Sequence, residues 1–159
     1  MNEGDELFAV LYPSLRRLAA AVRPPEVDAD DLVQEALVRT LAAGPLSGYD
    51  DLGAYLRTVI VNLARNHRRS FTRHPTVPAA DPHRDAHGAD VYPSDLADLR
   101  RLKPDERAVL YLSVVEGRGY EEIGRILGCN APAARARQSR AMRRLRAELR
   151  EEESYDEAL

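Results

Sequence analysis

The feature that most constrains this chain is a proline-rich interruption between two long stretches of helical periodicity. Segment 72–93 has few apolar residues and contains Pro75, Pro78, Pro82 and Pro93. Proline cannot continue a helix, and a core-poor segment cannot pack, so this stretch predicts a flexible linker. The 159-residue chain is then expected to be all-α, with two small helical domains at 5–71 and 94–152 and an acidic tail at 153–159.

Three helices are expected before the linker. The first runs from Asp5 to Val22, where apolar residues recur at steps of three and four, and a Pro-Pro pair ends it. Asp28 is a good N-cap for the second, whose stop is Gly44. The inward stripe of this second helix is expected to hold Leu32, Val33, Ala36, Leu37 and Leu41.

A third helix is expected from Asp50 to about Ser70, with a basic outer face. Its inner stripe carries Leu52, Leu56, Val59 and Leu63. At 100° per residue the opposite face gathers Arg57, Thr58, Val61, Arg65, Arg68 and Arg69. This face is either an ordinary solvated surface, with an isolated exposed valine, or a surface for an anionic partner.

The second block predicts a helix-turn-helix. Ser94 caps a short helix, and Pro104 takes a first helical position in the next, which carries Val109, Leu112 and Val115. The segment Tyr120 to Leu127 forms another helix, ended by Gly128. Asn130 then caps a final helix from Ala131 to about Glu152. Its inward positions are Ala134, Ala141, Leu145 and Leu149.

Charge is segregated along the chain although the formal net charge is only −3. Four arginines and no acid occur in 65–73, and six arginines and no acid occur in 135–146, whereas the tail is acidic. Lys103 is the only lysine, so the positive charge is almost entirely guanidinium, which suits planar contacts to phosphate and guanine. Any nucleic-acid role must therefore rest on these local clusters.

Several classes of protein are disfavoured by the sequence. The single cysteine, Cys129, excludes an internal disulfide and a cysteine-rich zinc site, and it is expected to be a small core residue. His74, His83 and His87 are interpreted as linker histidines rather than metal ligands. No apolar run reaches about 18 residues, and no glycine loop or nucleophile motif indicates an enzyme or a cofactor. We expect a cytoplasmic protein without catalytic residues, metal or cofactor.

Two motif blocks resemble one known family. The run LRRLKPDERAVLYLSVVEGRGYEEIGRILG, at 99–128, resembles region 4 of extracytoplasmic-function (ECF) sigma factors of the sigma-70 superfamily. The runs DADDLVQEALVRTL, at 28–41, and AYLRTVIVNLARNHRRS, at 54–70, resemble region 2 of the same family. The two blocks occur in the family's order on either side of a polar linker. The resemblance implies a subunit that directs RNA polymerase to promoters.

The resemblance also implies roles for individual residues. The DLVQE helix would dock on the clamp helices of core polymerase through Asp31, Gln34, Glu35 and Arg39, and the second domain would reach the flap. The −10 element would be held by Tyr49, Arg57, Arg65, Arg68 and Arg69. Tyr55 is a second available ring, but it falls near the core side of the helical wheel, where a buried residue is expected. The −35 element would be contacted by Arg137, Arg140, Arg143 and Arg144.

The last helix departs from the family pattern. It begins with Pro132, Ala133 and Ala134, which cannot donate hydrogen bonds to base edges, and Gln138 takes a usually apolar position. Specificity for −35 is therefore expected to be weak or to rest on shape. The alternatives are a degenerate sigma-like regulator that binds polymerase or a partner without reading promoters, and a stand-alone helix-turn-helix regulator. The promoter consensus, the inducing signal and the presence of an anti-sigma factor stay open.

Overall fold

The computed structural model describes residues 3–73 and 98–158, and every regular element in these ranges is helical. Most of the expected linker, together with Ser94 and the three linker histidines, lies outside the described residues. The first block contains α1 (Glu3–Val22), α2 (Ala29–Ala43), the short 3₁₀ turn η1 (Leu46–Gly48) and α3 (Leu52–Arg73). The second contains η3 (Asp98–Arg101), α4 (Pro104–Leu110), the π-helical η4 (Tyr111–Val115), α5 (Tyr120–Leu127) and α6 (Ala131–Glu157).

The helix ends follow local capping signals. Asp28 accepts hydrogen bonds from the backbone N–H of Asp30, at 2.8 Å, and of Asp31, at 3.4 Å. Asn130 accepts from Ala133 N at 2.8 Å. Such bonds satisfy amides that have no partner within the helix, so the predicted starts of α2 and α6 are confirmed.

The turn between α5 and α6 depends on two glycines. Gly128 adopts φ +73°, the left-handed conformation that ends a helix at least cost when the residue has no Cβ. A Cβ on Gly124 would lie 2.5 Å from the carbonyl oxygen of Cys129, so only glycine fits this close approach without a shift of the turn. Cys129 itself is half-buried against the core rather than fully inside it.

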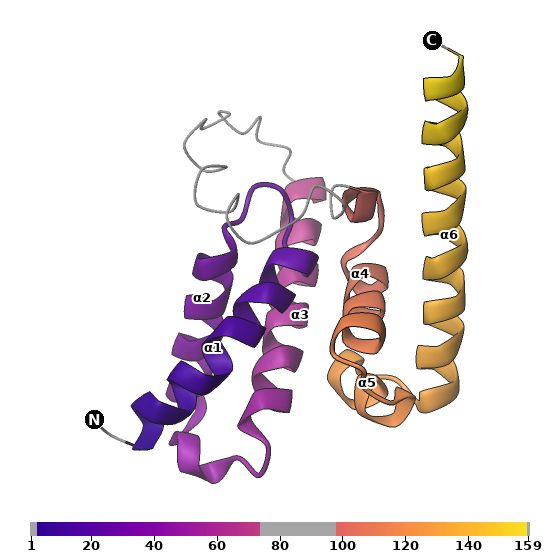
Figure 1. Cartoon of the computed structure of the whole chain (residues 1–159). Helices are drawn as coiled ribbons and strands as arrows, with labels where there is room; N and C mark the ends of the chain where they lie inside the picture. Colours follow the sequence, from indigo (N-terminus) through magenta and orange to yellow (C-terminus); the bar gives the residue numbers. More distant parts are fainter. Residues whose placement is uncertain (1–2, 74–97, 159) are drawn as a thin grey trace.

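The two blocks lie against each other along α3 (Figure 1). Helices α1, α2 and α3 form a bundle, α4 and α5 pack on α3, and α6 lies on the far side of α4 and α5. The buried residues of both blocks join in one hydrophobic cluster, with Leu56 and Ile60 in the first block and Leu112 and Ile123 in the second. The expected domain boundaries therefore separate two sequence blocks that share a packed interface.

Some expectations about burial are wrong. Val61 is fully buried rather than exposed, because the outer face of α3 is covered by the second block. Leu41 on α2 and Leu149 on α6 are 55% and 40% exposed rather than on the buried stripe. Of the three apolar residues expected on the helix after Pro104, Val109 and Leu112 are buried, whereas Val115 is 62% exposed at the end of the π-helical turn, where Glu116 N bonds to Tyr111 O.

Candidate nucleic-acid and protein interfaces

The outer face of α2 gathers the four residues predicted to bind polymerase. Asp31, Gln34 and Arg39 are exposed, and Glu35 is half-buried. Arg39 Nη2 lies 2.9 Å from Glu35 Oε1, and His67 Nε2 on α3 lies 3.0 Å from Glu35 Oε2. The hydrogen bond with His67 is the main reason that the pKa of Glu35 is lowered, so this carboxylate stays charged.

Apolar side chains are mixed with these charges. Val38 is 64% exposed on the same helix, next to the exposed Leu41. Exposed apolar groups rimmed by polar residues are typical of a protein-binding surface. The α2 face therefore combines an apolar centre with charged neighbours.

Two tyrosines form a ring pair at the start of α3. The ring centroids of Tyr49 and Tyr55 lie 4.4 Å apart with the planes tilted by 35°, and Tyr49 Oη donates to Thr40 O at 3.3 Å. Tyr55 is 38% exposed, so the expectation that it lies in the core is wrong. Tyr49 directly follows the turn η1, and its ring lies beside that of Tyr55.

Arg57 is buried under the second block and does not lie on an open basic face. Only 5% of the residue is exposed, and its Nε lies 3.0 Å from Glu116 Oε2. Its Nη1 donates to Gly53 O at 3.0 Å, and its Nη2 donates to Ser14 Oγ at 3.1 Å. In this arrangement Arg57 therefore cannot contact DNA phosphate as predicted, since its guanidinium is already paired with the carboxylate of Glu116.

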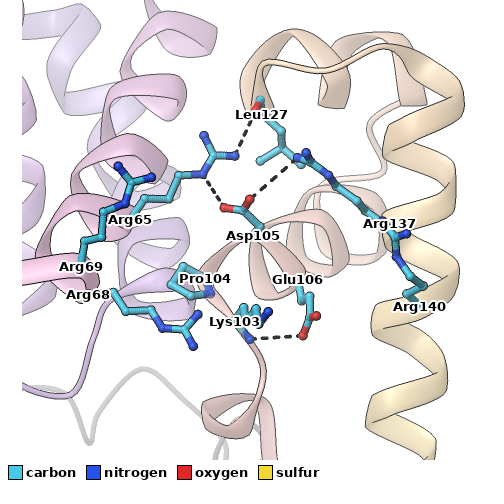
Figure 2. Close-up of a pocket in the computed structure, with 10 residues that line it drawn as sticks. All are labelled: Arg65, Arg68, Arg69, Lys103, Pro104, Asp105, Glu106, Leu127, Arg137 and Arg140. Carbon is cyan, nitrogen blue, oxygen red and sulfur yellow. Dashed lines mark hydrogen bonds and ion pairs between the residues drawn. The ribbon is translucent and has the colours of Figure 1, made fainter. Parts of the chain in front are cut away.

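Arg65, about two turns further along α3, is also paired with a carboxylate of the second block (Figure 2). It forms an ion pair with Asp105 of α4, and its Nη2 donates to Leu127 O at 3.0 Å. The other Asp105 oxygen lies 3.8 Å from Arg137 Nη1 on α6. One carboxylate thus lies between a predicted −10 arginine and a predicted −35 arginine.

These residues line a cleft between the blocks, of about 700 Å³. Its lining is strongly cationic, with six basic residues and two acids: Arg65, Arg68, Arg69, Lys103, Arg137 and Arg140, with Asp105 and Glu106. Arg68 and Arg69 are exposed at its edge. The cleft has an excess of positive charge and could attract an anion.

The arginines of helix α6 lie on its outer face, opposite a buried face that contains alanines. Ala134 and Ala141 are fully buried, whereas Arg140 and Arg143 are exposed and form no ion pair within the described part of the chain. Arg144 is also exposed but pairs with Glu106 at 2.9 Å. This geometry is consistent with the prediction that these side chains point away from the core. Arg137 is the least exposed of the four, since it is half-buried and faces Asp105 across the cleft.

The contacts of three residues were not predicted from the sequence. Asp105 and Glu116 were not predicted as partners of the α3 arginines, because each lies 40 or more residues away from its arginine in the sequence. In addition, Asp105 lies in the first turn of α4, where an acid is ordinarily explained by the helix dipole. Gln138, a departure from the family pattern, accepts from Tyr120 Oη and donates to Ser113 Oγ at 3.0 Å. It therefore ties α6 to α5 and η4 through a satisfied polar network.

Neither a metal centre nor a membrane span is found where the chain is described. Residues 3–73 and 98–158 contain no group of three or more His, Cys, Asp or Glu side chains placed to hold an ion. No helix in those ranges is both long and apolar enough to cross a bilayer.

Comparisons with known proteins match both blocks. The family described as Sigma-70 region 2 matches residues 7–74, and the family described as Sigma-70, region 4 matches residues 99–145. The two matches fall on the α1–α3 bundle and on the helix-turn-helix block.

Curated relatives match over most of their length. The chain is 32% identical over 154 residues to the ECF RNA polymerase sigma factor EcfG of Rhodopseudomonas palustris, covering 91% of this chain and 83% of that protein. It is 34% identical over 156 residues to the RNA polymerase sigma-E factor of Streptomyces avermitilis, covering 92% and 85%.

A solved structure shares the fold. The sigma factor RpoE of Bartonella quintana, crystallised in complex with the anti-sigma factor NepR, superposes with a TM-score of 0.67. The sequence identity is 24%, and the match covers 94% of this chain and 98% of RpoE.

Proposed function

Because this chain belongs to the ECF RNA polymerase sigma factors of the sigma-70 family, we propose that its α2 face docks on core polymerase and that its α6 arginines contact the −35 element. As a sigma factor it binds core polymerase and directs it to promoters for transcription initiation. The observation that carries the residue assignment is the separation of two unlike exposed surfaces, one mixed apolar and charged on α2 and one cationic on α6.

The α2 face suits a protein partner. Val38 and Leu41 offer apolar area, and Asp31, Glu35 and Arg39 supply charges around it. Complementary charge at an interface speeds encounter and fixes register, while the apolar centre contributes affinity. This combination supports the assignment of Asp31, Gln34, Glu35 and Arg39 to the clamp helices.

The −10 element is assigned to the tyrosine pair and the basic end of α3. Capture of a melted base requires a ring on which the base stacks and cations that hold the single strand. Tyr55 is exposed beside Tyr49, and Arg68 and Arg69 are exposed further along the same helix. Arg57 and Arg65 join this surface only after their carboxylate partners leave.

The −35 element is assigned to the outer face of α6. Arg140 and Arg143 project from a helix whose inner face is held by Ala134 and Ala141, so they reach DNA without opening the core. The start of the helix, at Pro132 to Ala134, is poor in donors, which favours phosphate positioning over base reading. Arg137 and Arg144 would exchange a carboxylate for phosphate.

Further assignments rest on the family. Sigma factors act by binding while polymerase performs the chemistry, so we assign no reaction, and we place the protein in the cytoplasm with the polymerase. RpoE of Bartonella quintana was crystallised with the anti-sigma factor NepR. We propose that a partner of the anti-sigma class also binds this chain.

Transcription in vitro with core polymerase and a promoter library tests the assignment. Substitution of both arginines, Arg140→Ala with Arg143→Ala, should reduce transcripts at least tenfold, a loss of about 1.4 kcal/mol or more. Arg150→Ala is the matched control, because Arg150 is an exposed arginine further along the same helix. Equal initiation by the double variant and the control on every template would show that α6 does not serve promoter recognition.

A further inference from the structure

We propose that the cleft between α3, α4 and α6 is a binding site for a small polyphosphate anion, that is, a molecule with several linked phosphoryl groups. Inorganic polyphosphate and nucleoside polyphosphates share this chemistry. The proposal goes beyond promoter recognition, because it concerns a small ligand of the chain alone. It is carried by the volume of the cleft, by its excess of positive charge and by the contacts of its basic side chains.

The volume of the cleft suits a small molecule. At about 700 Å³, it lies within the range of about 300 to 1,000 Å³ that is usual for small-molecule sites. A double helix cannot enter a space of this volume, and a single orthophosphate ion fills only a small part of it. An anion with several phosphoryl groups in a row is therefore the better match.

Cationic side chains lie on both walls of the cleft (Figure 2). Besides Arg65, they come from three segments: Arg68 and Arg69 of α3, Lys103 before α4, and Arg137 and Arg140 of α6. Guanidinium groups bind phosphate oxygens through pairs of N–H donors. A chain of phosphoryl groups carries negative charge at several points, so one molecule can contact both walls at once.

The acids of the cleft leave part of this charge uncompensated. Asp105 is paired with Arg65, and Glu106 is paired with an arginine of α6 that does not line the cleft. Lys103 and Arg140 form no ion pair with a described residue, and both are exposed. Their positive charges are therefore open to an anion that enters from solvent.

Arg137 has a donor that the described part of the chain leaves without an acceptor. Its Nη1 atom is buried and forms no hydrogen bond there. Asp105 Oδ2 lies 3.8 Å away, which is beyond hydrogen-bond distance. A buried donor without an acceptor is unfavourable, because the hydrogen bonds that it makes in water are lost. The Arg137 side chain is still 31% exposed, so a small rotation brings it to a phosphate oxygen in the cleft.

The lining favours phosphate over a nucleobase. The described residues that line the cleft include no aromatic ring, and its apolar contacts come from Pro104 and Leu127. Stacking on an aromatic ring is a common way to hold a base without reading its identity. Affinity should therefore depend on the number of phosphoryl groups, with little contribution from a nucleoside.

Four of the lining arginines are the same residues that are assigned to promoter DNA: Arg68, Arg69, Arg137 and Arg140. A bound polyphosphate and the promoter phosphates would therefore compete for these guanidinium groups. This consequence rests on the proposed function, whereas binding of the anion to the chain alone does not.

Isothermal titration calorimetry of the full chain with inorganic tripolyphosphate tests the site. The buffer contains no divalent cation and about 0.15 M salt, which screens exposed charges beyond about 8 Å. Binding should be one to one. Orthophosphate should bind at least about tenfold more weakly, because it reaches only one wall.

Two double variants locate the site. Lys103→Gln with Arg137→Gln should weaken the binding of tripolyphosphate at least about tenfold, because two charge-assisted contacts are lost. Arg125→Gln with Arg150→Gln is the matched control, since it removes the same charge from exposed arginines outside the cleft. The control should change the dissociation constant less than about twofold.

Titration with GTP distinguishes the two sources of the ligand. Equal affinity for GTP and tripolyphosphate is expected and assigns the site to the phosphate chain. Tighter binding of GTP that is lost in Lys103→Gln with Arg137→Gln assigns it to a nucleotide, and both results support a polyphosphate site. The absence of one-to-one binding by either probe overturns the proposal. Equal weakening by the cleft variant and the control also overturns it, since that result indicates general attraction of charge.

Two further results are separable. If the cleft variant loses helical circular dichroism, Lys103→Gln alone carries the test, since that residue is exposed. If the parent chain binds tripolyphosphate but core polymerase with this chain transcribes no template, the proposed function fails and the polyphosphate site stands.

Discussion

Helices α3 and α6 carry similar arginine-rich segments but place them in opposite environments. On α3, Arg57 is buried and Arg65 is bound to a carboxylate and a backbone carbonyl of the other block. On α6, Arg140 and Arg143 are exposed. An arginine cluster therefore predicts affinity for anions, while the identity of the anion depends on what packs against the helix.

The difference also changes what each arginine contributes to stability. Removal of a guanidinium that pairs with a buried carboxylate lowers the free energy of unfolding strongly, because the charged carboxylate is left without a partner in a low-dielectric site. An exposed arginine loses only solvent-screened interactions. Stability and DNA binding should therefore depend on different members of the two clusters.

The largest expected effect is a difference in the free energy of unfolding between an arginine variant on α3 and one on α6. Arg57→Ala should lower the free energy of unfolding by about 3 kcal/mol, at the low end for a broken buried pair because Arg118 still holds Glu116. Arg143→Ala should change it by no more than about 0.5 kcal/mol. Urea denaturation followed by circular dichroism measures both, and equal losses for the two variants would remove the contrast between α3 and α6.

A second prediction addresses DNA binding by α6. If the guanidinium of Arg140 reads a base, Arg140→Ala should weaken the binding free energy for promoter DNA by about 1 to 3 kcal/mol. If it holds a phosphate, the slope of the logarithm of the binding constant against the logarithm of the salt concentration should become shallower by about one. Holoenzyme binding to a cognate promoter and to −35 variants, at several salt concentrations, distinguishes the two. The donor-poor start of α6 favours the phosphate outcome. Binding identical to that of the parent at every salt concentration would exclude both roles.

A third prediction concerns the binding of core polymerase by the exposed face of α2. Gln34→Arg places a positive charge on the exposed α2 face without disturbing the Glu35 contacts to Arg39 and His67. Affinity for core polymerase should fall about fivefold, on the order of 1 kcal/mol. Ala147→Arg, an exposed position on α6, is the control. If both variants bind core polymerase equally well, the clamp assignment of α2 is wrong.

The smallest expected effect is spectroscopic and concerns a polar contact inside the first block. Burial, and next its hydrogen bond to Asp30, raise the pKa of Tyr12 from 10.0 to about 12. A raised pKa favours the neutral phenol in the folded state, so this contribution to stability is present below pH 10.0 and is lost as the pH rises towards about 12. An ultraviolet titration should show a late-ionising phenol that Tyr12→Phe removes, and an unchanged titration curve in that variant would reject the assignment.

Local features were predictable from the sequence. Asp28, Asn130 and Gly128 end or begin helices where expected, because capping and left-handed backbone conformation depend on atoms within a few residues. The buried faces of α1, α2 and α6 near their centres also follow from helical periodicity. Family motifs in two blocks, at 28–41 and 99–128, were sufficient to identify the resemblance to sigma factors.

The environment of the α3 outer face was decided by tertiary structure alone. A helical wheel places Arg57, Val61 and Arg65 opposite the core of their own bundle, and no local signal indicates that a second block covers them. Arg57 and Val61 are buried and Arg65 is half-buried, and the partners of the two arginines, Glu116 and Asp105, lie 59 and 40 residues away in the sequence. Periodicity specifies which residues share a face, whereas the exposure of that face depends on long-range packing, so the sequence determined the helices and only the fold determined which arginines meet solvent.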